Sequence, residues 1–169
     1  GGQSSPVTSW VYDDAGQLLS VEDALGRITS FSYDDLGRLI EKTLPDPDGG
    51  GSQTAPVFSW SYDILGNVLS ATDALGNVTE YSYDRLNRVL TQTDPDPDGA
   101  GGQSSPVTTW AYDKNNHVTS VTDALTRTTT FEYDHLGRLI LTTLEDPDGA
   151  GPQSAPDYAT TYNAASLVV

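Results

Sequence analysis

Hydrophobic and polar positions alternate along most of the chain, in short runs separated by turn-forming residues. In the run 57–62, Phe58, Trp60 and Tyr62 fall on one side of an extended chain, and Val and Ser residues fall on the other. Runs of about six residues rich in Val, Thr, Tyr, Phe and Leu have the composition of β-strands. For the stretch 51–100 the pattern predicts strands at 57–62, 67–72, 77–83 and 88–93.

Most neighbouring runs are joined by a tetrad that begins with Asp and usually ends with Gly. Asp at the first position of a type I turn accepts backbone N–H bonds, Gly at the fourth tolerates positive φ, and the turn can lead into a bulged hairpin. Asn87 and Asn116 are acceptable replacements for this glycine, whereas Thr126 predicts strain or a different turn. The predicted turn-forming residues are Asp13, Asp34, Asp63, Asp84, Asp113 and Asp134, with Gly37, Gly66 and Gly137.

The chain repeats itself with a period of 50 residues, as the positions of Trp10, Trp60 and Trp110 show. A fixed period without insertions indicates a repeat array. The predicted domains are three repeat units, 1–50, 51–100 and 101–150, followed at 151–169 by the start of a truncated fourth. Each full repeat unit holds two Tyr-Asp repeats and ends in a long acidic loop rich in Gly and Pro. Because 101–113 nearly reproduces 1–13, we expect an excised fragment of a longer repetitive protein.

The short spacing between runs leaves no room for helical crossovers, so consecutive strands must be antiparallel. The predicted fold class is all-β: an antiparallel meander of successive β-hairpins in a coiled open sheet of about 13 strands, the last beginning at 157–162. One face is aromatic, and the other carries small polar residues apart from Leu19 and Leu69. The predicted inner-face aromatic residues are Trp10, Tyr12, Tyr33, Trp60, Tyr62, Tyr83, Trp110, Tyr112 and Tyr133.

Composition narrows the possible functions. The formal charge is −16, with 24 acidic residues against 8 Lys and Arg. This balance argues against nucleic acid and against adhesion to anionic membranes, since both need clustered cations. No apolar run approaches transmembrane length, so we expect no membrane insertion. The chain has no Cys, which excludes disulfides, a Cys metal site and a Cys nucleophile.

A known pattern is visible at 33–39 and 133–139, which read Tyr-Asp-x-x-Gly-Arg-Leu, with Asp-Ala-Leu-Gly between copies. This resembles the YD repeat of the RHS family, and similar repeats occur in bacterial toxin-complex C components and in teneurins. The resemblance covers essentially the whole chain, although the copies alternate between short and long spacing and Tyr162-Asn163 replaces one Tyr-Asp.

The resemblance implies a long β-hairpin strip that spirals into a hollow shell. In toxins of the family the shell encloses a C-terminal polypeptide, and in surface proteins it forms a rigid ectodomain. The implied partners are therefore the rest of the parent chain or an enclosed polypeptide, and the implied location is extracellular or at the cell surface. Autoproteolysis belongs to a separate region beyond the repeats, so no catalytic residue is transferred.

The acidic loop 94–99 is the strongest candidate for a binding site. Asp94, Asp96 and Asp98 alternate with Pro and precede Gly99, which resembles the opening of a calcium loop. The bidentate Glu of an EF-hand does not follow. The alternative is a solvated acidic loop that discourages aggregation at the sheet edge. Apart from Ca²⁺, no cofactor is expected.

Other polar residues favour structural roles. A repeated Tyr-Asp pair is not a preorganised catalytic site, so no catalytic residue and no enzymatic activity are expected. His117 and His135 are interpreted as surface residues. The arginines that follow the turns are expected to pair with aspartates of neighbouring turns, and these are Arg38, Arg88 and Arg138.

The sequence therefore predicts a structural scaffold module, a fragment of a YD-repeat shell or stalk that encloses or displays another polypeptide. The alternative is an extracellular adhesion module that is stiffened by Ca²⁺ or binds carbohydrate through the repeated tryptophans. Because a strip of this length leaves an apolar face uncovered, we also expect self-association through that face or through the open ends of the sheet.

Overall fold

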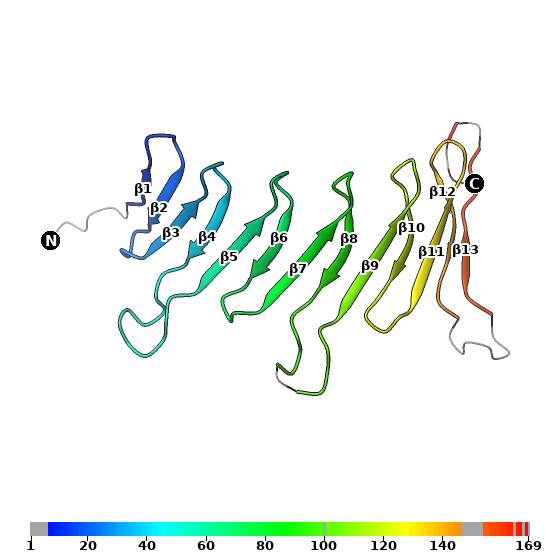
Figure 1. Cartoon of the computed structure of the whole chain (residues 1–169). Coiled ribbons are helices and arrows are strands. Elements are labelled where there is room, and N and C mark those ends of the chain that lie inside the picture. The colour runs from blue at the N-terminus through cyan, green and yellow to red at the C-terminus, as the bar shows by residue number, and fades with distance from the viewer. Residues whose placement is uncertain (1–6, 100, 147–153, 164, 167, 169) are drawn as a thin grey trace. The chain divides into compact units, whose positions relative to one another are not determined.

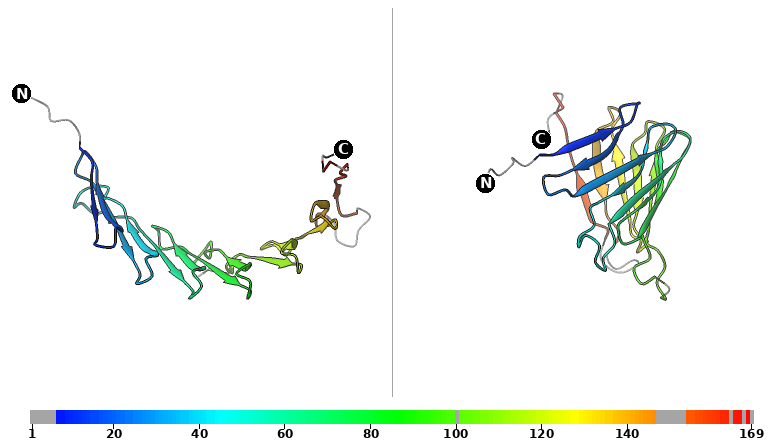
Figure 2. Two further views of the ribbon diagram at one scale, coloured as in Figure 1. Left: turned by 90° about the horizontal axis from the view of Figure 1, so that it is seen from above. Right: turned by 90° about the vertical axis from the view of Figure 1, so that its left-hand side faces the viewer.

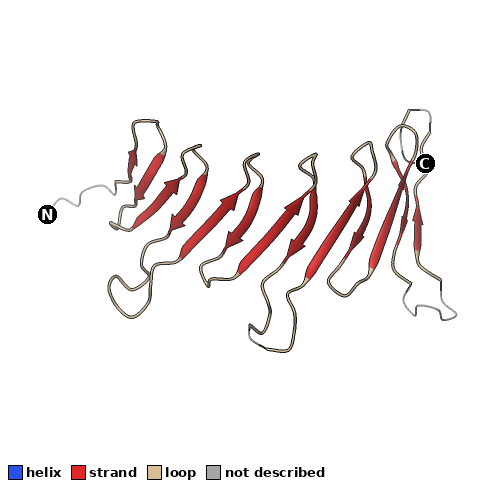
Figure 3. Cartoon of the chain, in the orientation of Figure 1, coloured by secondary structure: helices blue, strands red, loops and turns tan. Residues whose placement is uncertain are grey.

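The computed structural model describes residues 7–99, 101–146, 154–163, 165, 166 and 168. These residues form strands and turns and contain no helix (Figure 3). The strands follow one another in the sheet in chain order, and every strand pair whose register is given is antiparallel (Figure 1). The predicted all-β meander is thereby confirmed.

The thirteen strands have similar lengths. They are β1 (Ser9–Tyr12), β2 (Leu18–Glu22), β3 (Ile28–Tyr33), β4 (Leu39–Thr43), β5 (Val57–Tyr62), β6 (Val68–Thr72), β7 (Val78–Tyr83), β8 (Val89–Thr93), β9 (Val107–Tyr112), β10 (Val118–Thr122), β11 (Thr128–Tyr133), β12 (Leu139–Thr143) and β13 (Asp157–Ala159).

The chain divides into two compact units, an N-terminal half (residues 1–79) and a C-terminal half (residues 80–169). β1 to β6 lie in the first and β8 to β13 in the second, and the boundary falls within β7. The contacts described below are those within each half.

Several strands begin one residue later than predicted. β6 begins at Val68 instead of position 67, because the carbonyl of Asn67 accepts a 2.9 Å hydrogen bond from the N–H of Asp63 and so closes the turn. β7 and β8 start late for the same reason. The last strand is shorter than the predicted 157–162. Thr160 still donates to the carbonyl of Ile140, but Tyr162 forms an isolated bridge with Val168 instead of extending β13.

Every hairpin built on a Tyr-Asp repeat contains a shift in strand register next to the tyrosine. In the β3–β4 hairpin the shift lies between Ser32 and Tyr33, and in the β5–β6 hairpin it lies between Ser61 and Tyr62. The β2–β3 and β10–β11 hairpins, which have an Asp-Ala-Leu turn, keep a regular register. A β-bulge re-aims the side chains beside it. The bulge therefore gives each Tyr-Asp tyrosine its particular orientation.

Cross-strand partners share a face of an antiparallel sheet and show how the residues are sorted. In the N-terminal half, Phe31 pairs with Lys42, which pairs with Phe58. On the opposite face, Glu41 lies between Ser32 and Ser59. One face is therefore aromatic, and the other carries serine and glutamate.

The C-terminal half sorts its residues in the same way. Tyr81 pairs with Gln92, and Trp110 pairs with Val121. Glu80 directly precedes Tyr81 in β7, and Glu132 lies between Phe131 and Tyr133 in β11, so both glutamates lie on the opposite face.

Neither face is covered by a second layer within the described part of the chain. None of its hydrophobic side chains is fully buried. Figure 2 shows no second layer of strands over the sheet of either half. Packing in each half therefore comes from neighbours within the same sheet.

Candidate functional site

The Asp-led turns have one repeated geometry, which Asp34 illustrates. Its Oδ1 accepts the backbone N–H groups of Leu36 at 3.0 Å and of Arg38 at 2.9 Å. Its carbonyl accepts the N–H of Gly37 at 2.9 Å. The same two bonds to Oδ1 occur at all the predicted turn aspartates, which are Asp13, Asp34, Asp63, Asp84, Asp113 and Asp134. One carboxylate oxygen thus satisfies two donors that a bend would otherwise leave open.

In five of these six turns the second carboxylate oxygen binds the side chain four residues later. Arg38 donates its Nε to Asp34 at 2.7 Å, and Asn67 donates its amide to Asp63 at 2.8 Å. Arg88, His117 and Arg138 have equivalent bonds. The expectation that the arginines pair with aspartates of neighbouring turns is therefore wrong. The tight turn brings the guanidinium within reach of its own carboxylate.

These bonds favour the ionised carboxylate. The Arg38 guanidinium holds the pKa of Asp34 below its usual range, and the amide of Asn67 does the same to the pKa of Asp63. The effect is largest at Asp134, where the hydrogen bond from Arg138 lowers the pKa to about 2. At Asp34, Asp63 and Asp134 the folded turn therefore stabilises the charged form of the carboxylate.

The fourth position of each turn lies in the left-handed region of backbone conformation. Gly37, Gly66 and Gly137 have φ of 79°, 92° and 77°. Thr126 has φ of 64° and keeps the same turn, with its hydroxyl donating to the Leu125 carbonyl at 2.6 Å. Of the two outcomes expected at this threonine, the structure shows an unchanged turn with a backbone conformation that β-branched residues rarely adopt.

At five copies of the repeat the tyrosine reaches back to the preceding copy. Tyr33 donates its hydroxyl to the carbonyl of Leu18 at 3.1 Å, and Tyr62 donates to Leu39 at 2.8 Å. In the C-terminal half the same bond forms from Tyr112 to Val89, from Tyr133 to Val118 and from Tyr162 to Leu139. The accepting carbonyl always lies six residues after the preceding copy's tyrosine, so each hydroxyl ties one hairpin to the next.

The residue that follows a turn also contacts the next tyrosine ring. Arg38 lies over the ring of Tyr62 at 4.8 Å and donates Nη1 to the carbonyl of Asp63 at 2.6 Å. Arg88 lies over Tyr112 at 4.5 Å and donates to the carbonyl of Asp113. Arg138 lies over Tyr162 at 4.5 Å. We call this arrangement the arginine clamp, defined by Arg38, Arg88 and Arg138.

His117 occupies the corresponding position in a shorter connection. Its ring stacks on Tyr133 with centroids 4.5 Å apart, and Nδ1 lies 3.0 Å from the Asp113 carboxylate. A Cβ added to Gly137 would come within 2.7 Å of its Nε2, so the neighbouring turn depends on glycine for space as well as for φ. His117 is half-buried between two turns, and the expectation of an ordinary surface position is wrong. His135 is exposed.

The aromatic residues expected on one face differ in how well they are covered. Trp10 and Tyr12 are each 56% exposed, because no described strand lies beyond β1. The corresponding residues farther along the sheet are half-buried by their neighbours, and they are Tyr33, Trp60, Tyr62, Tyr83, Trp110, Tyr112 and Tyr133.

The carboxylates of the acidic loop 94–99 bind the protein itself. Asp94 accepts the side-chain amide of Gln92 at 2.7 Å, and Asp96 accepts the N–H of Asp98 at 3.1 Å. Asp98 in turn accepts the N–H of Gln103 at 3.2 Å. Across the described ranges, no group of three His, Asp or Glu side chains converges as a metal site would require. The bonds to Asp96 and Asp98 satisfy backbone N–H groups of the loop.

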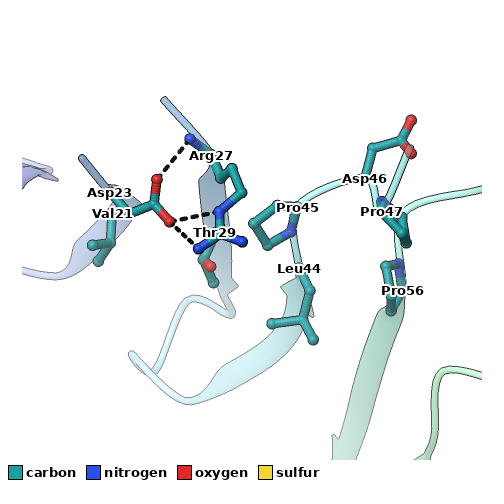
Figure 4. A pocket seen from close by; sticks show the side chains of 9 residues that line it. All are labelled: Val21, Asp23, Arg27, Thr29, Leu44, Pro45, Asp46, Pro47 and Pro56. Atoms are coloured by element: carbon teal, nitrogen blue, oxygen red, sulfur yellow. Dashed lines mark hydrogen bonds and ion pairs between the residues drawn. The ribbon is translucent and has the colours of Figure 1, made fainter. Parts of the chain in front are cut away.

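A shallow recess of about 420 Å³ lies in the N-terminal half, where the Asp23 turn meets the loop after β4 (Figure 4). Arg27 pairs there with Asp23 at 2.6 Å, and the loop supplies apolar and acidic groups. A similar recess of about 320 Å³ in the C-terminal half involves Asp123 and Arg127. The first recess is lined by Val21, Asp23, Arg27, Thr29, Leu44, Pro45, Asp46, Pro47 and Pro56.

Sequence reasoning found neither the recess nor the arginine clamp. The recess depends on how a long loop folds back on the sheet, which no local pattern encodes. The clamp did leave a signal, because each of its arginines lies five residues after one Tyr-Asp tyrosine and 24 residues before the next.

No helix long and apolar enough to cross a membrane is found among the residues whose structure is described.

The sequence matches the family model named RHS Repeat at residues 12–50, 62–99 and 106–150, which together make up most of the chain. The chain therefore belongs to the RHS repeat family. No curated protein sequence is significantly similar to it.

Solved structures show the same fold. One is the Photorhabdus luminescens Tc holotoxin pore, with a TM-score of 0.72, 23% identity, and coverage of 95% of this chain and 8% of the other. Another is a crystal structure of TcdB2-TccC3-Cdc42, with a TM-score of 0.69, 22% identity, and coverage of 92% and 8%. This chain spans less than a tenth of the length of either, so the likeness concerns the fold of the repeat strip.

Proposed function

We propose that the chain is a structural module, a stretch of a YD-repeat wall whose role is to give shape and stiffness to a larger protein. The observation that carries the proposal is the repeated tyrosine bond, which ties one hairpin to the preceding one at two places in the N-terminal half and at three in the C-terminal half. The same contacts recur at successive hairpins, which is the organisation of a wall. A binding or catalytic site is instead normally unique.

The finer part of the proposal is that the wall encloses or displays another polypeptide outside the cell. It is supported by membership of the RHS repeat family and by the fold shared with toxin assemblies. The uncovered aromatic face supports it too, since an exposed apolar surface of this kind normally meets a partner. We assign the partner to the parent chain.

The test is protease protection in the longest natural chain that contains this segment. We expect an enclosed polypeptide to resist a protease in the native protein and to be digested once Tyr62→Phe and Tyr112→Phe weaken the wall. If no segment of the parent chain is protected from the protease, enclosure is contradicted. The remaining form of the proposal is then a stalk that displays its partner.

Self-association is a related expectation for the isolated module. With its aromatic face uncovered, we expect the module to form dimers or larger species as its concentration rises. Size-exclusion chromatography with light scattering measures this. A strict monomer at high concentration would contradict it.

A carbohydrate-binding adhesion module is the second candidate, because a tryptophan recurs at the same position of each repeat unit. An exposed indole offers a flat surface on which a sugar ring can stack. Trp60 is more covered and serves as the matched control. A glycan that quenches the fluorescence of the parent but not of Trp10→Phe, while Trp60→Phe behaves as the parent, would establish this function.

A further inference from the structure

The three arginine clamps all join strand pairs that are connected by a long loop. Arg38 bridges β4 to β5, Arg88 bridges β8 to β9, and Arg138 bridges β12 to β13. At two pairs connected by a short Asp-led turn, the corresponding residues are Gln17 and His117. Arginine thus occurs where the chain connection is long.

The long loops contribute little to strand register. In the β4–β5 connection the closing backbone bond runs from the N–H of Leu44 to the carbonyl of Pro56 at 2.8 Å. The short turns instead hold their ends through two bonds to one aspartate oxygen, as at Asp23. A longer connection also costs more entropy to close and leaves more alternative registers open.

The clamp lies at the other end of the strand pair from the loop. Arg38 directly precedes β4 and Tyr62 ends β5, whereas the loop joins the far ends of these strands. At the clamp, Arg38 is held by Asp34 and contacts both the ring of Tyr62 and the carbonyl of Asp63. Tyr62 returns a hydrogen bond to Leu39 at 2.8 Å. Three side-chain contacts therefore fasten the end that the loop does not reach, and Asp34 holds the guanidinium in place for two of them.

We propose that the arginine clamp, and not the connecting loop, holds consecutive repeat units together, so that the chain stays assembled when the loop is cut. The long loop between β4 and β5 is then a site where the protein tolerates insertion or cleavage without losing its sheet. The proposal concerns how the units adhere and stands whether or not the parent chain encloses a polypeptide.

The experiment cuts the full chain in its first long loop. A specific protease sequence is inserted after Gly50, and the purified protein is cleaved into residues 1–50 and 51–169. Size-exclusion chromatography with light scattering over a dilution series gives the Kd of the two fragments. We expect the cleaved parent to elute with the mass of the intact chain.

Arg38→Gln removes the clamp and keeps a side chain that can donate to Asp34. We expect the Kd of its fragments to rise at least about tenfold, since a cation–π contact and a charge-assisted hydrogen bond are lost. Arg27→Gln is the matched control. Arg27 pairs with Asp23 in its own turn in the same way, but no tyrosine ring contact is found for it in the described structure. Its Kd should stay within about twofold of the parent.

Circular dichroism before cleavage shows whether each variant folds. If Arg38→Gln does not fold, Arg38→Lys replaces it, because lysine keeps the charge but loses the planar donor group; its Kd should rise in the same direction by a smaller factor. The proposal is overturned if the cleaved parent separates at once. It is also overturned if Arg38→Gln and Arg38→Lys bind as tightly as the parent, or if Arg27→Gln weakens binding as much as Arg38→Gln.

Discussion

The hydroxyl of Tyr62 donates to the carbonyl of Leu39 at 2.8 Å, so the end of one hairpin is fixed to the start of the strand before it. The Tyr62 ring also lies under the guanidinium of Arg38. The sequence predicts that Tyr62 covers one face of the sheet. In the structure it also joins β4 to β5 at the end of the strand pair where the Asp-led turns lie. Its polar tip and its ring have separate partners, as is common for half-buried tyrosines.

Tyr62→Phe tests this bond while leaving the ring in place. We expect the free energy of unfolding to fall by about 1 kcal/mol, the usual net value of one intramolecular hydrogen bond. Urea unfolding measures it. Tyr12→Phe is the control, since no hydrogen bond is found for the Tyr12 hydroxyl in the described structure and its ring is exposed. Equal losses in the two variants would show that the hydroxyl bond contributes nothing.

Thr126→Gly is expected to stabilise the protein. Thr126 has φ of 64°, a conformation that costs a β-branched residue about 1 kcal/mol relative to glycine. Part of this gain is offset because glycine makes the unfolded chain more flexible. Asn116→Gly, at φ of 70°, should change the stability less, since asparagine tolerates this region. A thermal midpoint lower for Thr126→Gly than for the parent would contradict the strain.

Acid should weaken the turns in a defined interval of pH. The pKa of Asp134 is lowered to about 2 in the folded chain, whereas an unfolded aspartate titrates near 3.9. A depressed pKa gives stability that is present above the unfolded value and lost as the pH falls through the folded value. The stability of the parent should therefore drop between about pH 4 and pH 2.

Asp134→Asn isolates the contribution of this aspartate to the pH dependence of stability from the contributions of the other acidic residues. It should be less stable than the parent at pH 7, and the difference should shrink as the pH falls from about 4 through 2, where the parent carboxylate takes up its proton. Thermal unfolding at a series of pH values provides the comparison. A difference that does not change with pH would mean that the charge of Asp134 is unimportant.

Calorimetry tests calcium binding at the acidic loop. Because Asp96 and Asp98 already accept backbone N–H groups, we expect no heat when millimolar Ca²⁺ is titrated into the protein. The double variant Asp96→Ala and Asp98→Ala should give an identical calorimetric trace. Heat that appears in the parent and vanishes in the variant would support a calcium-stiffened module.

The strands and turns could be predicted from the sequence because each depends on interactions among adjacent residues. The alternation of Phe58, Trp60 and Tyr62 is a property of six adjacent residues, and the turn at Asp34 depends on bonds within five. Strand starts shifted by one residue because the position after the tetrad belongs to the turn, as at Asn67.

The joints between hairpins could not be predicted in the same way. Sequence reasoning paired Arg38 with the aspartates of neighbouring turns, whereas the structure pairs it with Asp34 of its own turn. The choice depends on reach in three dimensions. The β-bulge beside Tyr62 orients its hydroxyl toward the Leu39 carbonyl. Residue spacing alone predicts neither the bulge nor this hydrogen bond.

The most direct test of the central claim is a nuclear Overhauser experiment on the strand pairs that flank the long loops. The pairs Lys42 with Phe58 and Gln92 with Thr108 are far apart in sequence and not joined by a tight turn. The tandem-hairpin wall predicts cross-strand contacts at both pairs, together with contacts between the Tyr62 ring and Arg38. Their absence in a folded protein, or helical contacts across the Asp-led tetrads, would contradict it.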